Sequence, residues 1–417
     1  MTVAAAEQTP HFPPFRPDDP TTTSLEAYLG ESVPAAGEPF RGTQLTARYD
    51  WYRLMREHRP VAHDPDTGFW YLFRHQDVRQ ALTDPATFSN ALVPYFDGDP
   101  LTGSMLRTDP PRHRTLRSLV GPAFSARRIA ALREQVRALV AGLLDRTDDA
   151  DLDVVPAISL ELPTLVIATL LGIDPVLHRD FQRWTGAFMR ASTRREVDER
   201  SAADLGAMRD YFAATLAERR RTPKDDLIGT LVAAEVDGER LSDDDLLRFC
   251  NLLLIGGIET TTHLITNSVV CLARYPSQAA RVRQDPALLP QFVDEVLRFL
   301  SPNQGIPRET TRDVELHGQV IPRGARVIAL NGSAHRDAAA LPDPDTFDLG
   351  RPQDRLLAFG HGIHYCLGAA LAKLEAEETL TAMLARLPGR WEVPTTVEVM
   401  PSRLMSGLRS LPLRWTP

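Results

Sequence analysis

Between residues 75 and 300, hydrophobic residues recur at intervals of three and four positions, which is the repeat of an amphipathic helix. Aspartate, serine and proline often stand where these periodic segments begin, as they do at helix N-termini. The pattern predicts helices at residues 75–82, 110–120, 126–145, 157–171, 175–192, 202–221, 242–274 and 288–300, preceded by a short helix at 48–58. We therefore expect this part of the chain to be mostly helical.

Alternation of hydrophobic and polar residues, which is typical of strands, is confined to short runs. Two such runs, 60–63 and 68–73, flank the turn-forming sequence Asp-Pro-Asp-Thr-Gly and predict a hairpin. Further strands are expected at residues 314–316, 319–321 and 326–329. The coil that follows, 341–355, is longer than most loops in compact proteins, so we expect it to wrap around part of the molecule.

These elements predict a mainly α fold with a smaller β region. The helical stretch offers no point at which it divides into independent units, so residues 46–417 are expected to form one large domain. Residues 1–45 are rich in proline, threonine and glycine and are expected to form an irregular lead-in.

The amino-acid composition excludes several classes of protein. With 43% hydrophobic and 24% charged residues, the 417-residue chain can bury a large core and does not have the composition of a disordered protein. Its net charge of −8 argues against a nucleic acid partner. Three widely spaced cysteines, Cys250, Cys271 and Cys366, cannot form a disulfide framework and indicate a reducing compartment, the cytoplasm.

A membrane location is not expected. The N-terminal residues lack the basic region and apolar core of a secretory signal. The most apolar helical stretch, 251–273, is interrupted by Glu259, His263 and Asn267, whose polar groups are costly in hydrocarbon. This stretch is therefore predicted to be a helix through the core of the protein.

The densest cluster of chemically versatile residues is 359–368, with the sequence Phe-Gly-His-Gly-Ile-His-Tyr-Cys-Leu-Gly. Its three glycines indicate backbone that side chains would obstruct. Cys366 stands where the next helix begins, and there the free N–H groups and positive dipole end favour the thiolate that a metal ligand requires. A zinc site formed by His361, His364 and Cys366 stays possible, although a fourth ligand is missing at the usual spacing.

This cluster resembles the haem-binding loop of cytochrome P450, which reads Phe-x-x-Gly-x-His-x-Cys-x-Gly. Phe359, Gly362, His364, Cys366 and Gly368 match every defined position. The resemblance extends from about residue 50 to the end of the chain, and it implies a P450-like fold with haem between the long central helix and the cysteine loop. It also implies that Cys366 is the proximal thiolate ligand of the haem iron, that Phe359 shields it, and that His364 reaches a haem propionate.

A second motif is the pair Glu295 and Arg298, which lie on one helical face because they are three residues apart. Alone, such a pair is usually an exposed contact worth under about 1 kcal/mol. In its order before the cysteine loop it is similar to the family's helix-K pair, which joins with an arginine of the later coil to form a structural core behind the haem. Arg351 matches that third position.

The third motif, Gly256 and Gly257 followed by Glu259 and Thr260, lies inside the longest predicted helix. Each glycine costs about 1 kcal/mol relative to alanine in a helix interior, which indicates either a need for space beside the backbone or a kink that relieves packing. The Thr260 hydroxyl can bond to the Gly256 carbonyl, or open that turn and hold water.

The same motif is similar to the family's oxygen-binding sequence. By that resemblance the two glycines lie beside the cofactor. Thr260 positions water at the oxygen site, and Glu259 relays protons to it. His263 follows one turn later and could either tune Glu259 or be an ordinary core histidine.

Other basic residues are candidate contacts to the carboxylates of a ligand. His113 and Arg117 are one helical turn apart. They resemble the family's bacterial His-x-x-x-Arg pattern, which implies contacts to haem propionates, and Arg308 matches another propionate-binding arginine. The chain departs from the family pattern at His335, where asparagine is usual, and at Leu356, where many bacterial members carry histidine.

The substrate pocket can be placed only by family position. The segments concerned are mostly apolar and fit a mid-sized hydrophobic molecule such as a polyketide, macrolide, terpenoid or steroid, either free or tethered to a carrier protein. The positions are Leu92, Val93, Tyr95, Phe96, Phe188, Met189, Leu252, Ile255, Gly256, Asn303, Gln304, Gly305, Ile306, Leu404 and Met405.

The resemblance implies a haem-thiolate monooxygenase that uses haem b and O2, with hydroxylation as the default reaction and a role in secondary metabolism. Because the chain has no flavin-like or iron–sulfur-like segment, electrons must come from a separate donor, expected to be a ferredoxin with its reductase. Candidate contacts to that acidic donor are Arg112, Arg114, Arg127, Arg128 and Lys373. We expect a monomer.

Two other functions stay open from the sequence. The first is a haem-thiolate sensor or binding protein without turnover, in which Glu259 and Thr260 would have no catalytic role. The second is a zinc hydrolase built on His361, His364 and Cys366.

Overall fold

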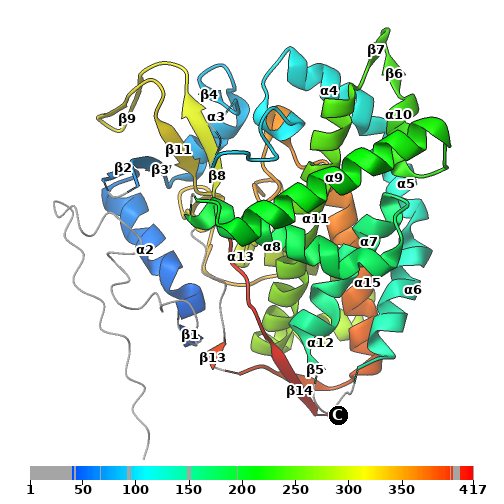
Figure 1. The fold of residues 1–417 in the computed structure, drawn as a ribbon. Helices are drawn as coiled ribbons and strands as arrows, with labels where there is room; N and C mark the ends of the chain where they lie inside the picture. Colours follow the sequence, from blue (N-terminus) through cyan, green and yellow to red (C-terminus); the bar gives the residue numbers. More distant parts are fainter. Residues whose placement is uncertain are drawn as a thin grey trace, which may run out of the picture.

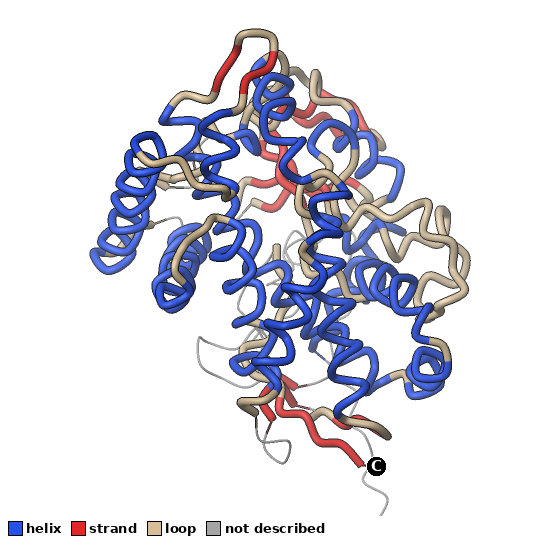
Figure 2. The backbone as a smooth tube through the Cα atoms, turned by 90° about the vertical axis from the view of Figure 1, so that its right-hand side faces the viewer, coloured by secondary structure: helices blue, strands red, loops and turns tan. Residues whose placement is uncertain are grey.

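Helices form most of the chain in a computed structural model that describes residues 40–41, 44–65, 67–91, 94, 96–147, 152–194, 196–394, 396–397 and 404–416 (Figures 1 and 2). Most of the predicted lead-in lies outside these residues. The longer helices are α2 (Gln44–His58), α3 (His75–Thr83), α4 (Arg112–Val120), α6 (Arg133–Leu144), α7 (Glu161–Leu170), α8 (His178–Arg194), α9 (Glu199–Arg221), α11 (Asp243–Arg274), α12 (Pro276–Gln284), α13 (Leu289–Phe299) and α15 (Ala369–Arg386). Shorter ones are α5 (Ala126–Ala131), α10 (Leu227–Ala233) and α14 (Asn331–Ala334).

The predicted helices agree with this arrangement, with one break. The segment 126–145 divides into α5 and α6 at Leu132, whose amide bonds back to Ile129 as a helix end does. Helices α10, α12 and α14 are additional to the sequence prediction. The mainly α fold class is therefore confirmed.

A mixed five-stranded sheet packs at one side of the molecule, beside α2 and α3, whereas α6, α7 and α15 lie at the other side (Figure 1). Its order is β2 (Val61–Asp64), β3 (Phe69–Leu72), β11 (Arg326–Ala329), β8 (Ile306–Thr310) and β4 (Phe88–Ser89). The predicted hairpin is β2–β3, and β3 pairs in parallel with β11 through Tyr71 opposite Ile328. Strands β4 and β8 are additional to the prediction, and β8 connects α13 to the rest of the sheet.

The remaining strands form small pairs. The predicted strands β9 (Val314–Leu316) and β10 (Gln319–Ile321) make an antiparallel hairpin. Near the C-terminus, β12 (Arg390–Glu392), β14 (Pro412–Thr416) and β5 (Leu152–Asp153) form a three-stranded sheet. The other pairs are β1 (Phe40–Arg41) with β13 (Thr396–Val397), and β6 (Glu235–Val236) with β7 (Glu239–Arg240).

Helix α11 runs through the hydrophobic core and contacts α7, α9, α13 and α15. It begins in a capping box, in which Ser242 and Asp245 bond to each other's backbone N–H groups. One of its buried polar side chains is hydrogen-bonded across the core: the Asn267 amide donates to the carbonyl oxygens of Leu300 and Ser406 at 2.9 and 3.3 Å. Among the described residues, no helix combines the length and apolar character needed to cross a bilayer.

Candidate functional site

The cysteine loop joins the coil to helix α15. The Cys366 amide donates to the Phe359 carbonyl oxygen at 2.9 Å, which closes the loop on itself. Gly362 has a φ of +74°, and a Cβ there would lie 2.9 Å from the Leu82 carbonyl oxygen, so a side chain is excluded both by conformation and by space. The result is a loop that presents Cys366 as a free, exposed thiol just before Gly368, the N-cap residue of α15.

Two opposing effects act on the Cys366 thiol. The atoms packed around the sulfur raise its pKa, while hydrogen bonds from the amides of Gly368 and Ala369 and the charge of Arg117 act to lower it. Its position where a helix begins predicts the lowering contribution, but the raising effect of the protein atoms packed around the sulfur is larger, although the residue as a whole is exposed. The Gly368 and Ala369 amides nevertheless provide donors suited to a sulfur that carries negative charge.

Four basic side chains converge near this loop from separate elements. His113 and Arg117 come from α4, Arg308 from β8, and His364 from the cysteine loop. The His113 and His364 rings lie 4.1 Å apart between centroids. His113 is buried, and its Nε2 has no hydrogen-bond partner among the described residues. Arg308 is buried as well.

Asp109 is the acidic member of this cluster, and the sequence analysis gave it no role. It accepts hydrogen bonds from the Ser89 hydroxyl and, at 3.1 Å, from the Asn90 amide, and its Oδ1 lies 3.6 Å from Nε2 of His364. Burial would raise its pKa, yet His364, Ser89 and Asn90 bring it to about 2. Asp109 is therefore a carboxylate at neutral pH, placed directly before the basic helix α4.

Burial changes the basic members in the other direction. It lowers the pKa of His113 to about 4, assisted by the charges of His364 and Arg117 and opposed by Asp109. It also lowers the pKa of Arg308 to about 10, again opposed by Asp109. The two arginines stay cationic at neutral pH, and His113 is neutral. The cluster thus carries net positive charge with a buried, unpaired ring nitrogen.

The motif inside α11 places its glycines in different surroundings. Gly256 is exposed although it lies in the middle of the core helix, and a Cβ on it would meet nothing within 4 Å. A Cβ on Gly257 would lie 2.7 Å from Cδ1 of Ile167 in α7. Gly256 therefore leaves open space beside the backbone, whereas Gly257 permits close packing of two helices.

Thr260 and Glu259 follow these glycines. The Thr260 hydroxyl donates to the Gly256 carbonyl oxygen at 2.8 Å, which is the first of the two arrangements predicted from sequence. Glu259 is buried, and its Oε2 has no hydrogen-bond partner among the described residues. Its Oε1 lies 3.8 Å from Nε2 of His263. Glu259 therefore keeps one carboxyl oxygen without a protein partner inside the described core.

His263 is not an ordinary satisfied core histidine. Both ring nitrogens lack hydrogen-bond partners in the described part of the chain, and the side chain is 2% exposed. A Cβ on Gly407 would lie 2.0 Å from Nδ1, so the C-terminal turn packs its bare backbone against the ring. The tuning of Glu259 by His263 stays a prediction from the sequence.

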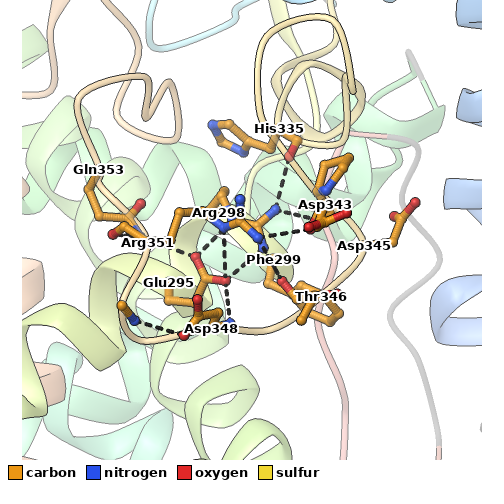
Figure 3. A network of polar contacts seen from close by, with 12 residues as sticks. Glu295, Arg298, Phe299, His335, Asp343, Asp345, Thr346, Asp348, Arg351 and Gln353 are labelled. Atoms are coloured by element: carbon orange, nitrogen blue, oxygen red, sulfur yellow. Dashed lines mark hydrogen bonds and ion pairs between the residues drawn. The ribbon is translucent and has the colours of Figure 1, made fainter.

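Behind the loop, the predicted Glu295–Arg298–Arg351 set is a buried network (Figure 3). Arg298 donates Nε and Nη2 to the two Glu295 oxygens at 2.7 Å each. Its other N–H groups bond to the carbonyl oxygens of His335, Pro344 and Thr346. The coil 341–355, which contains no helix or strand, therefore wraps around the Arg298 guanidinium as predicted.

Arg351 completes this network from the coil. Its Nε lies 3.6 Å from Oε1 of Glu295, and its guanidinium bonds to carbonyl oxygens of the coil, including that of Asp343 at 2.8 Å. The Gln353 amide also donates to Glu295, at 3.1 Å. These contacts anchor the coil to α13.

Comparison with known proteins agrees with this geometry. The model of the family described as "Cytochrome P450" matches residues 193–415. The cyclomarin C epoxidase of Salinispora arenicola is 40% identical over 371 residues, covering 87% of this chain and 94% of that protein. The chain belongs to the cytochrome P450 family. It is a P450 monooxygenase, and hence an oxidoreductase.

Further relatives match this P450 over a comparably large part of both chains. The erythromycin C-12 hydroxylase of Saccharopolyspora erythraea is 39% identical, with 88% of this chain and 94% of that protein covered. The solved structure of a cytochrome P450 from Chondromyces apiculatus superposes with a TM-score of 0.82 at 39% identity, covering 90% of this chain and 96% of the other. These likenesses extend over nearly the whole P450 fold.

The residues around Cys366 fit the haem that the family implies. The thiol is free, and the buried His113 nitrogen and the excess positive charge of Arg117 and Arg308 suit the carboxylates of haem propionates. Gly368 and Gly256 each leave open space where a Cβ would stand. The donor types, together with the open space at these two glycines, are compatible with a flat ligand that carries two carboxylates and an iron ion.

The alternative zinc site does not fit. Across the described ranges, no three histidine, cysteine, aspartate or glutamate side chains come together to hold a metal ion. The His364 ring instead lies 4.1 Å from that of His113 between centroids, and its Nε2 lies 3.6 Å from Asp109, while the charge of Arg117 acts on the Cys366 thiol. The zinc interpretation is wrong because the three residues of its motif do not converge.

The structure brings together part of the predicted substrate pocket. Phe96 and Phe188 make an edge-to-face contact with centroids 5.9 Å apart, which joins the segment before α4 to helix α8. Met189 and Leu252 are half-buried, and Ile255 is buried in α11 one residue before Gly256. Leu92, Val93 and Tyr95 lie outside the described residues.

Other predicted pocket residues meet at the C-terminal turn. Met405 forms a β-bridge with Asn303, and a Cβ on Gly305 would lie 3.2 Å from Leu404. Ile306 opens strand β8 and is half-buried. The turn after α13 and the C-terminal turn are therefore in contact, and their role in a substrate pocket stays a prediction.

Gln304 is an exception. Its side chain is fully buried, and its amide donates to the Ser301 carbonyl oxygen at 2.6 Å and to the Tyr49 hydroxyl at 3.2 Å. A Cβ on Gly332 would lie 2.1 Å from its Oε1. The structure does not support a substrate contact for Gln304, because its side chain is committed to the core.

Proposed function

We propose that this P450 inserts one oxygen atom from O2 into a mid-sized hydrophobic small molecule of secondary metabolism, with hydroxylation as the default reaction and with electrons from a ferredoxin and its reductase. The observation that supports it best is the free Cys366 thiol, held by the Phe359 carbonyl and faced by the amides of Gly368 and Ala369. A sensor without turnover would not need the buried Glu259 and the Thr260 hydroxyl beside an open stretch of helix.

Cys366 would hold haem b through its sulfur, and His113, Arg117, Arg308 and His364 would hold the propionates. Haem ligated by a thiolate supplies the activation of O2 and the oxidation of the substrate. The chain's own task is to supply protons and to exclude unproductive reactions. Phe359, half-buried beside Tyr365 with centroids 6.3 Å apart, would shield the sulfur.

Proton supply is assigned to Glu259 and Thr260. The reaction consumes two electrons and two protons, and one oxygen atom leaves as water while the other enters the substrate. Glu259 would pass a proton from its carboxyl group toward the Thr260 hydroxyl, and it would be recharged from water. The Thr260 hydroxyl, half-buried above Gly256, would orient the water that carries the proton.

The substrate class rests on the apolar lining and on the relatives. The relatives include an enzyme named for epoxidation of cyclomarin C and one named for hydroxylation of erythromycin. A cytochrome P450 of Bacillus megaterium, 32% identical with a TM-score of 0.79, was solved in complex with testosterone. We propose a substrate of comparable hydrophobic character, either free or carrier-tethered.

The electron donor would dock through exposed basic residues. Arg114, Arg127 and Arg128 are exposed. Arg112 forms an ion pair with Asp245, and Lys373 forms one with Asp294 at 2.7 Å. Arg114, Arg127 and Arg128 are therefore the stronger contacts for an acidic ferredoxin, because no carboxylate of the described residues competes for them.

The test is turnover by purified protein reconstituted with a ferredoxin and its reductase and supplied with candidate macrolides and steroids. Oxygenated product that depends on both the donor and Glu259 supports the proposal. A haem protein that binds these molecules with a spin-state change but forms no product would support the sensor instead. The monomeric state and cytoplasmic location stay predictions, for sedimentation and cell fractionation to check.

A further inference from the structure

Two buried histidines make hydrogen bonds with the backbone of residues 355–357, which lead into the cysteine loop. His335 follows α14, and its Nε2 accepts a hydrogen bond from the Leu357 amide at 2.8 Å. His75 opens α3, and its Nε2 lies 3.1 Å from the Arg355 carbonyl oxygen. A carbonyl can only accept and an amide can only donate, so His75 is the donor in its bond and His335 is the acceptor in its bond.

The two histidines also tie this segment to structure on both sides. The His75 amide donates to Oδ2 of Asp337 at 2.9 Å, which joins α3 to the stretch that carries His335. The His335 carbonyl accepts from Arg298 at 3.0 Å. A single residue therefore bonds to the Glu295–Arg298 network through its backbone and to the entry of the cysteine loop through its ring.

The connection from Leu357 to the sulfur is short. Leu357 is buried in the small hydrophobic cluster of the sheet, and its carbonyl accepts from the Gly360 amide at 2.9 Å. Phe359, two residues further on, accepts the Cys366 amide at 2.9 Å. Leu357 is thus two residues from Phe359, whose carbonyl accepts the amide of Cys366.

The ring of His335 suits this role. It is completely buried, and burial together with the charge of Arg298 holds its pKa well below the usual range. The neutral ring keeps Nε2 available as an acceptor.

We propose that His335 is a positioning residue for the thiolate: by accepting the Leu357 amide it locks the cysteine loop to the Glu295–Arg298 network and so sets the donor strength of the Cys366 sulfur. The inference rests on the proposed role of Cys366 as haem ligand. It assigns His335 no contact to substrate or to the reacting atoms.

The test compares three variants of the full-length holoprotein. His335→Leu removes the acceptor, His335→Gln offers an amide oxygen close to the position of Nε2, and His317→Leu is the control. His317 contacts Asp77 of α3 at 2.8 Å and, among the described residues, makes no hydrogen bond to the cysteine loop. The readouts are hydrogen exchange of the peptide 355–366, the reduced carbon-monoxide spectrum and the reduction potential.

We expect His335→Leu to speed exchange in this peptide about tenfold or more, because a buried amide loses its partner. The thiolate-type band should decline and the reduction potential should shift in the molecules that still contain haem. His335→Gln should restore both, and His317→Leu should change neither. A purely structural role would lower haem content without changing the spectrum or potential of the loaded fraction.

If His335→Leu does not accumulate, His335→Phe takes its place, since it also removes the Nε2 acceptor but keeps a ring in the buried site. The inference would be overturned if the first of these variants that folds showed the wild-type hydrogen exchange in peptide 355–366, the wild-type carbon-monoxide band and the wild-type reduction potential. A wild-type protein without a thiolate-type band would instead refute the proposed function, and the exchange measurement would still decide whether His335 holds the loop.

Discussion

Two buried polar regions of this P450 differ in how fully they are hydrogen-bonded. At α13, each of the five N–H donors of Arg298 has an acceptor, supplied by Glu295 and by three backbone carbonyls. In α11, Glu259 and His263 are also buried, yet Glu259 Oε2 and both His263 nitrogens lack hydrogen-bond partners among the described residues. A saturated network holds a shape, whereas an unsaturated one leaves polar atoms available to water or to a ligand.

The largest effect should come from breaking the saturated network. Arg298→Lys replaces a planar five-donor group with three donors and leaves Glu295 poorly paired in the core, so we expect the free energy of unfolding to fall by about 3–5 kcal/mol. Urea unfolding measures it. The control, Arg281→Lys, alters a half-exposed arginine 3.8 Å from Asp348 and should cost under about 1 kcal/mol. Equal losses in the two variants would contradict the difference between the regions.

A substitution in the incompletely hydrogen-bonded region of α11 should lower the yield of product per electron pair and leave the stability of the fold unchanged. Thr260→Ala should lower product formed per electron pair about tenfold or more, with hydrogen peroxide released instead, because proton delivery is lost. Thr262→Ala is the matched control, since Thr262 makes the same bond to a carbonyl four residues earlier, at 2.9 Å, but is fully buried. Coupling is measured as product and peroxide per NADPH consumed. Unchanged coupling in Thr260→Ala would remove Thr260 from the proton path.

A buried acid outside both regions gives a smaller, pH-dependent effect. Glu375 in α15 is 1% exposed, one of its oxygens has no partner among the described residues, and burial raises its pKa well above the usual range. The unfolded chain loses this proton near pH 4.3 and the folded chain only at higher pH, so stability falls as the pH rises between these values.

Glu375→Gln mimics the protonated form. Its melting temperature should exceed that of the wild type by a few degrees at about pH 8 and match it at about pH 4.5. Thermal unfolding at both pH values checks this. A variant less stable than the wild type at the higher pH would mean that the carboxylate has a stabilising partner.

The smallest effect separates the two glycines of α11. Gly256→Ala gains helix propensity without a clash and should stabilise the protein by up to about 1 kcal/mol before ligands bind. Gly257→Ala gains the same propensity but pushes against Ile167, so its net change should be near zero or unfavourable. The comparison fails if Gly257→Ala proves the more stable variant in urea unfolding.

Much of the fold follows from local pattern. Helix α11 and the β2–β3 hairpin were predictable because periodicity and turn residues define them within a short window. Strand β8 was missed because Pro307, Arg308 and Glu309 interrupt any alternation, and its place between β11 and β4 is set by tertiary pairing. The break at Leu132 carries no proline or glycine signal.

The functional site also divides into residues that the sequence motifs located and contacts that the sequence could not show. The motifs located Cys366, Thr260 and the Glu295–Arg298 pair because their residue types and spacing are unusual. The sequence could not give Asp109 its place among the bases, or the His335 bond to Leu357, since these contacts join residues far apart in the chain. It also could not show that the Gln304 side chain turns into the core.

The central claim, that Cys366 ligates haem iron through its sulfur, is tested most directly by the difference spectrum of the reduced, carbon-monoxide-bound protein. The account predicts the thiolate-type band in the wild type and its loss in Cys366→Ser. A wild-type protein that stays colourless with haem supplied, or a Cys366→Ser variant that keeps the wild-type band and turnover, would contradict it.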